Sequence, residues 1–114
     1  MPKPVKAYPV RLAGTRSYQR AIARAAAGDV AELLRENGKP YDVDALVVVD
    51  CDGETLGYVP RDSWLRGALL DEGRGGRATI ETISDGADGV AGVTIAVMLT
   101  DDGAIGERDF VPAD

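Results

Sequence analysis

Short apolar segments, separated by turn residues, predict a chain made mostly of β-strands. Residues 45–49 are a continuous run of Ala, Leu and Val, which predicts a strand buried on both faces. Residues 93–99 alternate at period two, as one face of a strand does. Weaker patterns predict four more strands, over about 8–13, 30–35, 55–59 and 77–84. The 30–35 segment favours helix by propensity, but a helix of that length would be marginal.

Two segments have helical patterns. Residues 18–27 are rich in alanine and predict a first helix. Residues 62–71 predict a second helix, which the side chain of Asp62 or Ser63 would cap. We expect Trp64 to anchor this helix in the core, because it falls on one helical face with Leu65, Ala68 and Leu69.

In chain order these elements read β-α-β-β-β-α-β-β, a mainly β fold with two short helices (α+β). Hairpin turns, such as the one at Asp50–Glu54, make the sheet antiparallel. Closure into a small barrel is favoured because it removes exposed sheet edges. We expect an N-terminal arm at 1–7, a domain at 8–100 and a tail at 101–114, with one extra short strand at 109–111.

Composition excludes several classes of function. The 114 residues suit one domain, and 45% of them are hydrophobic. With no histidine and one cysteine, the common zinc sites and the Ser-His-Asp or Cys-His catalytic arrangements are excluded. No phosphate-binding Walker motif or hydrolase site is recognisable, so we expect neither an enzyme nor a cofactor. No apolar run resembles a signal peptide or a membrane span, and we expect a cytoplasmic protein.

Charge is unevenly distributed along the chain, whose net charge is −6. Residues 1–40 hold eight Lys/Arg and three Asp/Glu, a balance of +5. Residues 41–114 hold five Lys/Arg and sixteen Asp/Glu, a balance of −11. A basic face on an acidic body can hold a few phosphates while it repels long duplex DNA. A solvated helix face on an ordinary acidic surface would give the same two charge balances.

Three motifs carry most of the functional information. The first is Ala13-Gly14-Thr15-Arg16-Ser17-Tyr18. The second starts at Gly28-Asp29, continues with Val30-Ala31-Glu32-Leu33 and ends with Tyr41-Asp42-Val43-Asp44-Ala45-Leu46-Val47-Val48. The third is Leu56-Gly57-Tyr58-Val59-Pro60-Arg61. In order and spacing they resemble the HIRAN domain family, over about residues 8–99.

The resemblance implies an OB-like antiparallel barrel and a strand at 30–35. It also implies a DNA-repair or replication-fork role in which single-stranded DNA is bound at its free 3′ end, beside a helicase or nuclease partner. Arg16 and Tyr18 stand where the family has backbone and base contacts. Tyr41 stands where an aromatic stacks on the terminal base, and Asp42 where a carboxylate accepts from the 3′-hydroxyl. Arg61 stands where a cation meets a phosphate, and Tyr58 where DNA-binding members have a different polar ring.

Ser17 departs from the DNA-binding pattern, which has an aromatic residue there. A lost stack costs roughly 1–3 kcal/mol, or about 5- to 150-fold in affinity, so we expect binding on the order of micromolar or weaker. Structural roles are open for the same residues: Tyr41 as a rim shield, Asp42 as a turn cap and Tyr18 as core. The alternative function is a protein-interaction or adaptor domain of a DNA-processing complex with no direct DNA contact.

Overall fold

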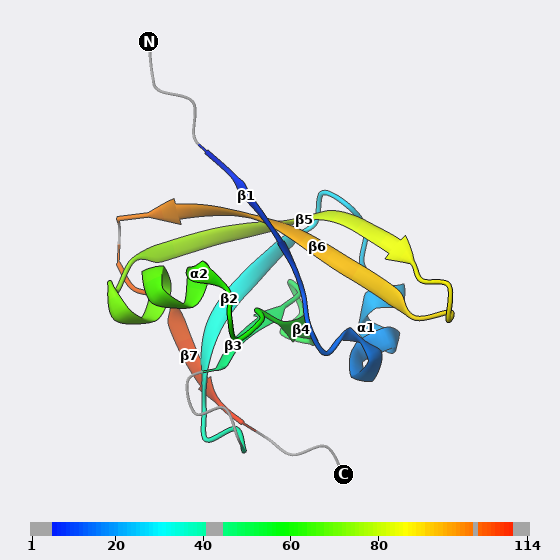
Figure 1. Cartoon of the computed structure of the whole chain (residues 1–114), viewed down its shortest axis with the longest axis horizontal. Coiled ribbons are helices and arrows are strands. Elements are labelled where there is room, and N and C mark those ends of the chain that lie inside the picture. Colours follow the sequence, from blue (N-terminus) through cyan, green and yellow to red (C-terminus); the bar gives the residue numbers. More distant parts are fainter. Residues whose placement is uncertain (1–5, 41–44, 102, 111–114) are drawn as a thin grey trace.

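A computed structural model describes residues 6–40, 45–101 and 103–110 of the chain. Figure 1 shows a strongly curved sheet with short helices at its ends. Two of the helical segments are η1 (Thr15–Tyr18) and α1 (Gln19–Ala23), and the other two are α2 (Trp64–Arg66) and η2 (Gly67–Asp71). The strands are β1 (Tyr8–Arg11), β2 (Val30–Asn37), β3 (Ala45–Val49), β4 (Thr55–Tyr58), β5 (Gly75–Asp85), β6 (Ala91–Thr100) and β7 (Gly106–Asp109).

The sheet follows the order β1-β6-β5-β2-β3-β4, and every pair along this path is antiparallel. Its two ends meet after β1, where Ala13 bridges Tyr58 of β4. The amide of Ala13 donates to the carbonyl of Tyr58 at 2.7 Å, and the amide of Tyr58 donates back at 2.9 Å. The predicted fold class, a mainly antiparallel barrel-like sheet with two short helical segments, is confirmed.

Residues of the first and third motifs make this closure. Gly14 has φ +72, a left-handed conformation that glycine adopts without strain. A Cβ on Gly57 would lie 3.0 Å from the carbonyl oxygen of Ala13 and 3.1 Å from the Cβ of Leu12. Both glycines therefore let the first and third motifs approach each other closely.

Strand β3 separates two hydrophobic clusters, and its prediction as a strand buried on both faces is confirmed. The larger cluster is the core and takes Leu46 and Val48. The smaller cluster consists of Ala45, Val47, Val49 and Tyr58, with Tyr18 and Leu34 packed against it. One face of β3 therefore builds the core, and the opposite face builds the base of the site described below.

The two predicted helices differ from what the structure shows. The first helix ends at Ala23 rather than Ala27 and is preceded by a 3₁₀ turn, η1. The second begins as predicted, with Ser63 Oγ accepting from the amide of Leu65, but it widens to a π-helical turn in η2. Among the described residues, no helix has the length and apolar character to cross a membrane.

Trp64 is not the core anchor that the helical pattern predicted. It is 51% exposed, whereas Leu65, Ala68 and Leu69 of the same predicted face are buried. The reason is geometric, because those three residues fill the narrow stripe that faces the core and Trp64 falls beside it. Its ring instead meets the ring of Tyr8 edge-on, with centroids 4.8 Å apart.

The C-terminal strand is β7, at Gly106–Asp109 rather than the predicted 109–111. It pairs in parallel with Leu34–Asn37 of β2, so the sheet is not wholly antiparallel. Leu34, Arg35 and Glu36 also pair with β3, which places β7 on the opposite edge of β2. In Figure 1 the red strand β7 runs beside β2, far from the β5–β6 turn.

Candidate functional site

A cleft of about 240 Å³ opens beside the smaller cluster, and we call it the rim cleft. It combines residues from the first motif, from β2, from β4 and from the C-terminal segment. Its lining residues are Ser17, Tyr18, Glu36, Thr55, Tyr58, Arg108 and Phe110. Two of these, Tyr18 and Tyr58, are residues that the sequence selected as candidate DNA contacts.

Tyr58 forms the inner wall of the rim cleft and is only 7% exposed. Its ring lies 6.1 Å from that of Tyr18 at a tilt of 51°, and the ammonium of Lys39 lies over it at 3.2 Å from the centroid. Its hydroxyl donates to Glu36 Oε1 at 2.6 Å. Burial, reinforced by the hydrogen bond to Glu36, raises the pKa of Tyr58 far above its ordinary value. Tyr58 is therefore a neutral, fixed ring with little open face.

Glu36 is a buried carboxylate at the base of the rim cleft, 1% exposed. Arg108 stands opposite it in the β2–β7 register. Arg108 Nε donates to Glu36 Oε2 at 2.8 Å, and its Nη2 lies 2.6 Å from the same oxygen. Nη2 also donates to Thr55 Oγ1 at 2.7 Å. These charge-assisted contacts offset the cost of burying the carboxylate and tie β2, β4 and β7 together.

Arg61 lines a second, larger cleft of about 490 Å³, which we call the basic cleft. Two more guanidinium groups, from Arg35 and Arg66, line it. Asp62, Ser63 and Asp71 are also in its walls, so the cleft holds three cationic and two anionic groups. Guanidinium groups match phosphate oxygens in geometry and charge, so this cleft can accept one or a few phosphates.

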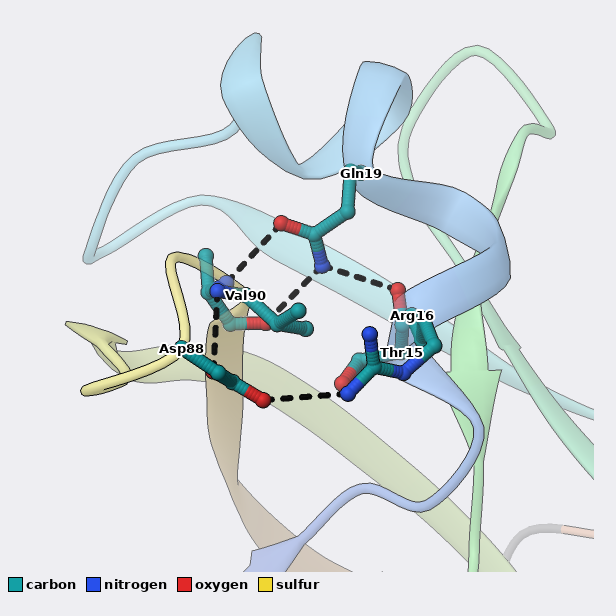
Figure 2. A network of polar contacts seen from close by, with 6 residues as sticks. Thr15, Arg16, Gln19, Asp88 and Val90 are labelled. Carbon is teal, nitrogen blue, oxygen red and sulfur yellow. Dashed lines mark hydrogen bonds and ion pairs between the residues drawn. The ribbon is translucent and has the colours of Figure 1, made fainter.

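Arg16 projects from η1 toward the β5–β6 turn, as Figure 2 shows. Its Nη2 donates to Asp88 Oδ2 at 3.0 Å, and both side chains are largely exposed. Asp88 Oδ1 accepts from the amide of Val90 at 3.1 Å. That backbone hydrogen bond, with a smaller contribution from Arg16, holds the pKa of Asp88 below its ordinary value. Arg16 is therefore already ion-paired and would have to leave Asp88 to bind a phosphate.

Gln19 makes the hydrogen bonds that join the helical segment carrying Arg16 to the sheet. Its Nε2 donates to the carbonyls of Thr15 at 2.9 Å and Ala91 at 3.0 Å, and its Oε1 accepts from the amide of Ala91 at 2.8 Å. These bonds hold η1 and α1 against the start of β6 (Figure 2). The backbone segment that carries Tyr18, the last residue of η1, is therefore anchored to the sheet.

The sequence-selected residues fall into separate groups. Tyr18 and Tyr58 share the rim cleft, Arg61 lies in the basic cleft, and Arg16 lies at the β5–β6 turn. Tyr41 and Asp42 lie outside the described residues. Sequence reasoning missed Glu36, Arg108 and Phe110. The sequence held one signal for Glu36, its place in the alternation of side chains along β2. Glu36 falls on the same face of the strand as Leu34, whereas Ala31 and Leu33 fall on the opposite face.

Metal ligands are not gathered in the described part of the chain. Within 6–40, 45–101 and 103–110, no group of three or more His, Cys, Asp or Glu side chains is arranged to hold a metal ion.

Comparison with known proteins gives the family. The family model of the HIRAN domain matches residues 5–88, more than half of the chain. No curated protein matches the chain.

Two solved structures share the fold. One is the HIRAN domain of human HLTF, with 18% identity and a TM-score of 0.63, over 82% of this chain and 74% of that one. The other is a protein from Lactobacillus plantarum, with 20% identity and a TM-score of 0.61, over 83% of this chain and 97% of that one. The first and third motifs build the barrel closure and contribute to the rim cleft, and the family model spans all three motifs, so this chain belongs to the HIRAN domain family.

Proposed function

We propose that this domain is a non-enzymatic module that binds single-stranded DNA at a free 3′ end. The observation that carries the proposal is the rim cleft, in which the half-buried ring of Tyr18 is held against the fixed ring of Tyr58. A ring of this kind, with one supported face, can stack a nucleobase.

Phosphate contacts come from Arg61 and its neighbours in the basic cleft. Arg16 contributes a further contact when it leaves Asp88. Both are guanidinium groups, which bind phosphate oxygens through two parallel hydrogen bonds. With one or two stacked bases and two phosphate contacts, affinity is on the order of micromolar or weaker. Function in DNA repair or fork processing then requires a helicase, nuclease or other protein partner, or avidity.

Recognition of the end itself falls to Tyr41 and Asp42 in this proposal. Tyr41 stacks on the terminal base, and Asp42 accepts from the 3′-hydroxyl. Support comes from the residues that flank them in the sequence. Lys39 lies over Tyr58, and Ala45 pairs with Glu36, so both ends of the segment start from the rim cleft.

Fluorescence anisotropy tests the proposal with short oligonucleotides ending in a 3′-hydroxyl, a 3′-phosphate or a closed hairpin. We expect the 3′-hydroxyl strand to bind best and Asp42→Ala to erase that preference. Asp52→Ala, which removes an exposed carboxylate at the β3–β4 turn, is the matched control. Equal or absent binding of all three ends at low salt would refute end recognition.

A protein-interaction role is the second candidate, and one observation favours it. Trp64 is 51% exposed and lies against Tyr8, with the ammonium of Lys6 5.2 Å from the Tyr8 centroid. Trp and Tyr are enriched among the residues that carry most of the binding energy of protein interfaces. Trp64→Ala should then abolish capture of a protein partner without changing DNA affinity. Equal recovery of that partner by the wild-type chain and by Trp64→Ala would exclude the surface around Trp64 as the interface.

A further inference from the structure

Phe110 lines the rim cleft although it comes from the opposite end of the chain to Tyr18. Its amide donates to the carbonyl of Asn37 at 2.8 Å, directly after the last β2–β7 pair, Asn37 with Asp109. The ring is half-buried. Phe110 is therefore held at the mouth of the cleft by its backbone.

Arg108 fixes the direction in which Phe110 projects. Side chains two residues apart in an extended segment point to the same side. Arg108 is anchored on Glu36 and Thr55 inside the rim cleft. Phe110, two residues later, consequently faces the same cleft, in agreement with its place among the lining residues.

The other walls leave room for a ring. Ser17 is exposed and contributes only a hydroxymethyl group. Tyr58 has Lys39 over its ring and Tyr18 against it, so it offers little surface for stacking. Tyr18 and Phe110 therefore supply the accessible aromatic surface of the cleft. A volume of about 240 Å³ suits a single planar group rather than a length of chain.

We propose that Phe110 is a base-stacking residue, which forms with Tyr18 a pocket for one nucleobase of the bound strand. This inference rests on the proposed function and deepens it, because it assigns the C-terminal segment to the ligand site. The segment lies beyond residues 5–88, the part matched by the family model. Phe110 thus supplies aromatic surface that the small side chain of Ser17 does not.

The test uses the full chain and a short single strand with a 3′-hydroxyl, labelled in turn at each position with the fluorescent base 2-aminopurine. Phe110→Leu keeps apolar bulk but removes the ring face, and should weaken binding by about 5- to 150-fold, the equivalent of one lost stack. In the wild-type complex, stacking on Phe110 should quench the fluorescence of 2-aminopurine at one position of the strand, and Phe110→Leu should restore that fluorescence. Phe110→Tyr should retain both the affinity and the quenching.

Two controls separate stacking from folding. Ser17→Phe combined with Phe110→Leu should recover affinity, because the new ring enters the same cleft. Trp64→Leu removes an exposed ring outside the cleft and should leave affinity unchanged. Thermal unfolding of each variant tests whether the domain is still folded and equally stable.

The outcomes are distinct. If the wild-type chain binds no oligonucleotide, the proposed function and this inference fall together. If it binds and Phe110→Leu binds equally well with equal quenching, only the role of Phe110 is overturned. Tighter binding by Phe110→Leu would also overturn it, because the C-terminal segment would then cover the cleft instead of completing it.

Discussion

Glu36 is the residue on which the rim cleft depends. At 1% exposure its carboxylate is deeply buried, and it accepts from Tyr58 and from Arg108. A buried carboxylate is tolerated only when other groups satisfy its charge and hydrogen bonds. The site is therefore organised by a polar residue that does not face the solvent.

Loss of Arg108 should destabilise the protein. Arg108→Gln leaves Glu36 buried without its cationic partner and should lower the free energy of unfolding by about 3 kcal/mol, the lower end of the range for broken buried pairs because Arg108 is 29% exposed. Urea unfolding measures this. The double variant Glu36→Gln with Arg108→Gln should recover most of the loss, and equal destabilisation of both variants would contradict the pairing.

Tyr58 should make stability depend on alkaline pH. Its pKa is raised in the folded protein, so its contribution is fully present below about pH 10, the ordinary tyrosine value, and is lost as pH rises further. Unfolding followed at increasing pH measures the decline. Tyr58→Phe loses the bond to Glu36 and should cost about 1.5–3 kcal/mol at neutral pH. Its stability should fall less steeply above pH 10, and an equal slope would assign the effect to other tyrosines.

Asp88 should compete with phosphate for Arg16. Asp88→Asn keeps an oxygen that can accept from the amide of Val90 but removes the charge beside Arg16. Binding of single-stranded DNA at low salt should then tighten a few-fold, and the gain should disappear at high salt because both groups are exposed. Anisotropy titrations at two salt concentrations check this. Unchanged low-salt affinity would remove Arg16 from the list of phosphate contacts.

At the scale of elements, closure between β1 and β4 decides the shape of the sheet. Gly57 permits the close approach at Ala13 and Tyr58. Gly57→Ala adds a methyl group within 3.2 Å of Ala13, Leu12 and Thr15, and should destabilise the protein by about 1–3 kcal/mol. Gly67→Ala is the matched control, because Gly67 has helical φ −61 and open surroundings. Urea unfolding should find the control unchanged or slightly stabilised. Equal effects would argue against a tight closure.

The end of the first helix depends on neighbours that the local pattern does not reveal. Arg24 follows the last helical residue, Ala23, and its side chain pairs with Glu54 on the β3–β4 turn. The chain then turns at Gly28, whose amide donates to the carbonyl of Ile80 on β5. Residues 24–27 therefore serve to join α1 to the sheet, although alanine favours helix.

At the scale of the molecule, the charge distribution limits how DNA can be held. The acidic balance of −11 over residues 41–114 makes broad electrostatic attraction unfavourable. Binding must then rely on a few local cations, such as Arg16 and Arg61.

For two phosphate contacts on a single strand, a plot of the logarithm of affinity against the logarithm of salt concentration should have a slope of about −1.4. Titrations at increasing salt measure the slope. Arg61→Gln should lower its magnitude by about half, and an unchanged slope would exclude Arg61.

Periodicity in the sequence was sufficient for the fold class and for the strands other than β7, which was expected at 109–111. The apolar run of β3 and the alternation of β6 were predicted correctly because a strand's side-chain pattern follows from backbone geometry alone. Motif spacing likewise pointed to the HIRAN family, which the family model confirms. The exposure of Trp64 was missed, because a helical face is wider than the stripe that its neighbours bury.

The sequence by itself determined the strands other than β7, the antiparallel hairpins, the family and the two candidate tyrosines of the rim cleft, because each depends on residues close together along the chain. Only the tertiary structure decided that β7 adds in parallel to β2 and that Arg108 reaches Glu36 across 72 positions. It also brought Phe110 into the same cleft as Tyr18. Such contacts arise from sheet register and closure, which place distant residues together without leaving a local pattern in the sequence.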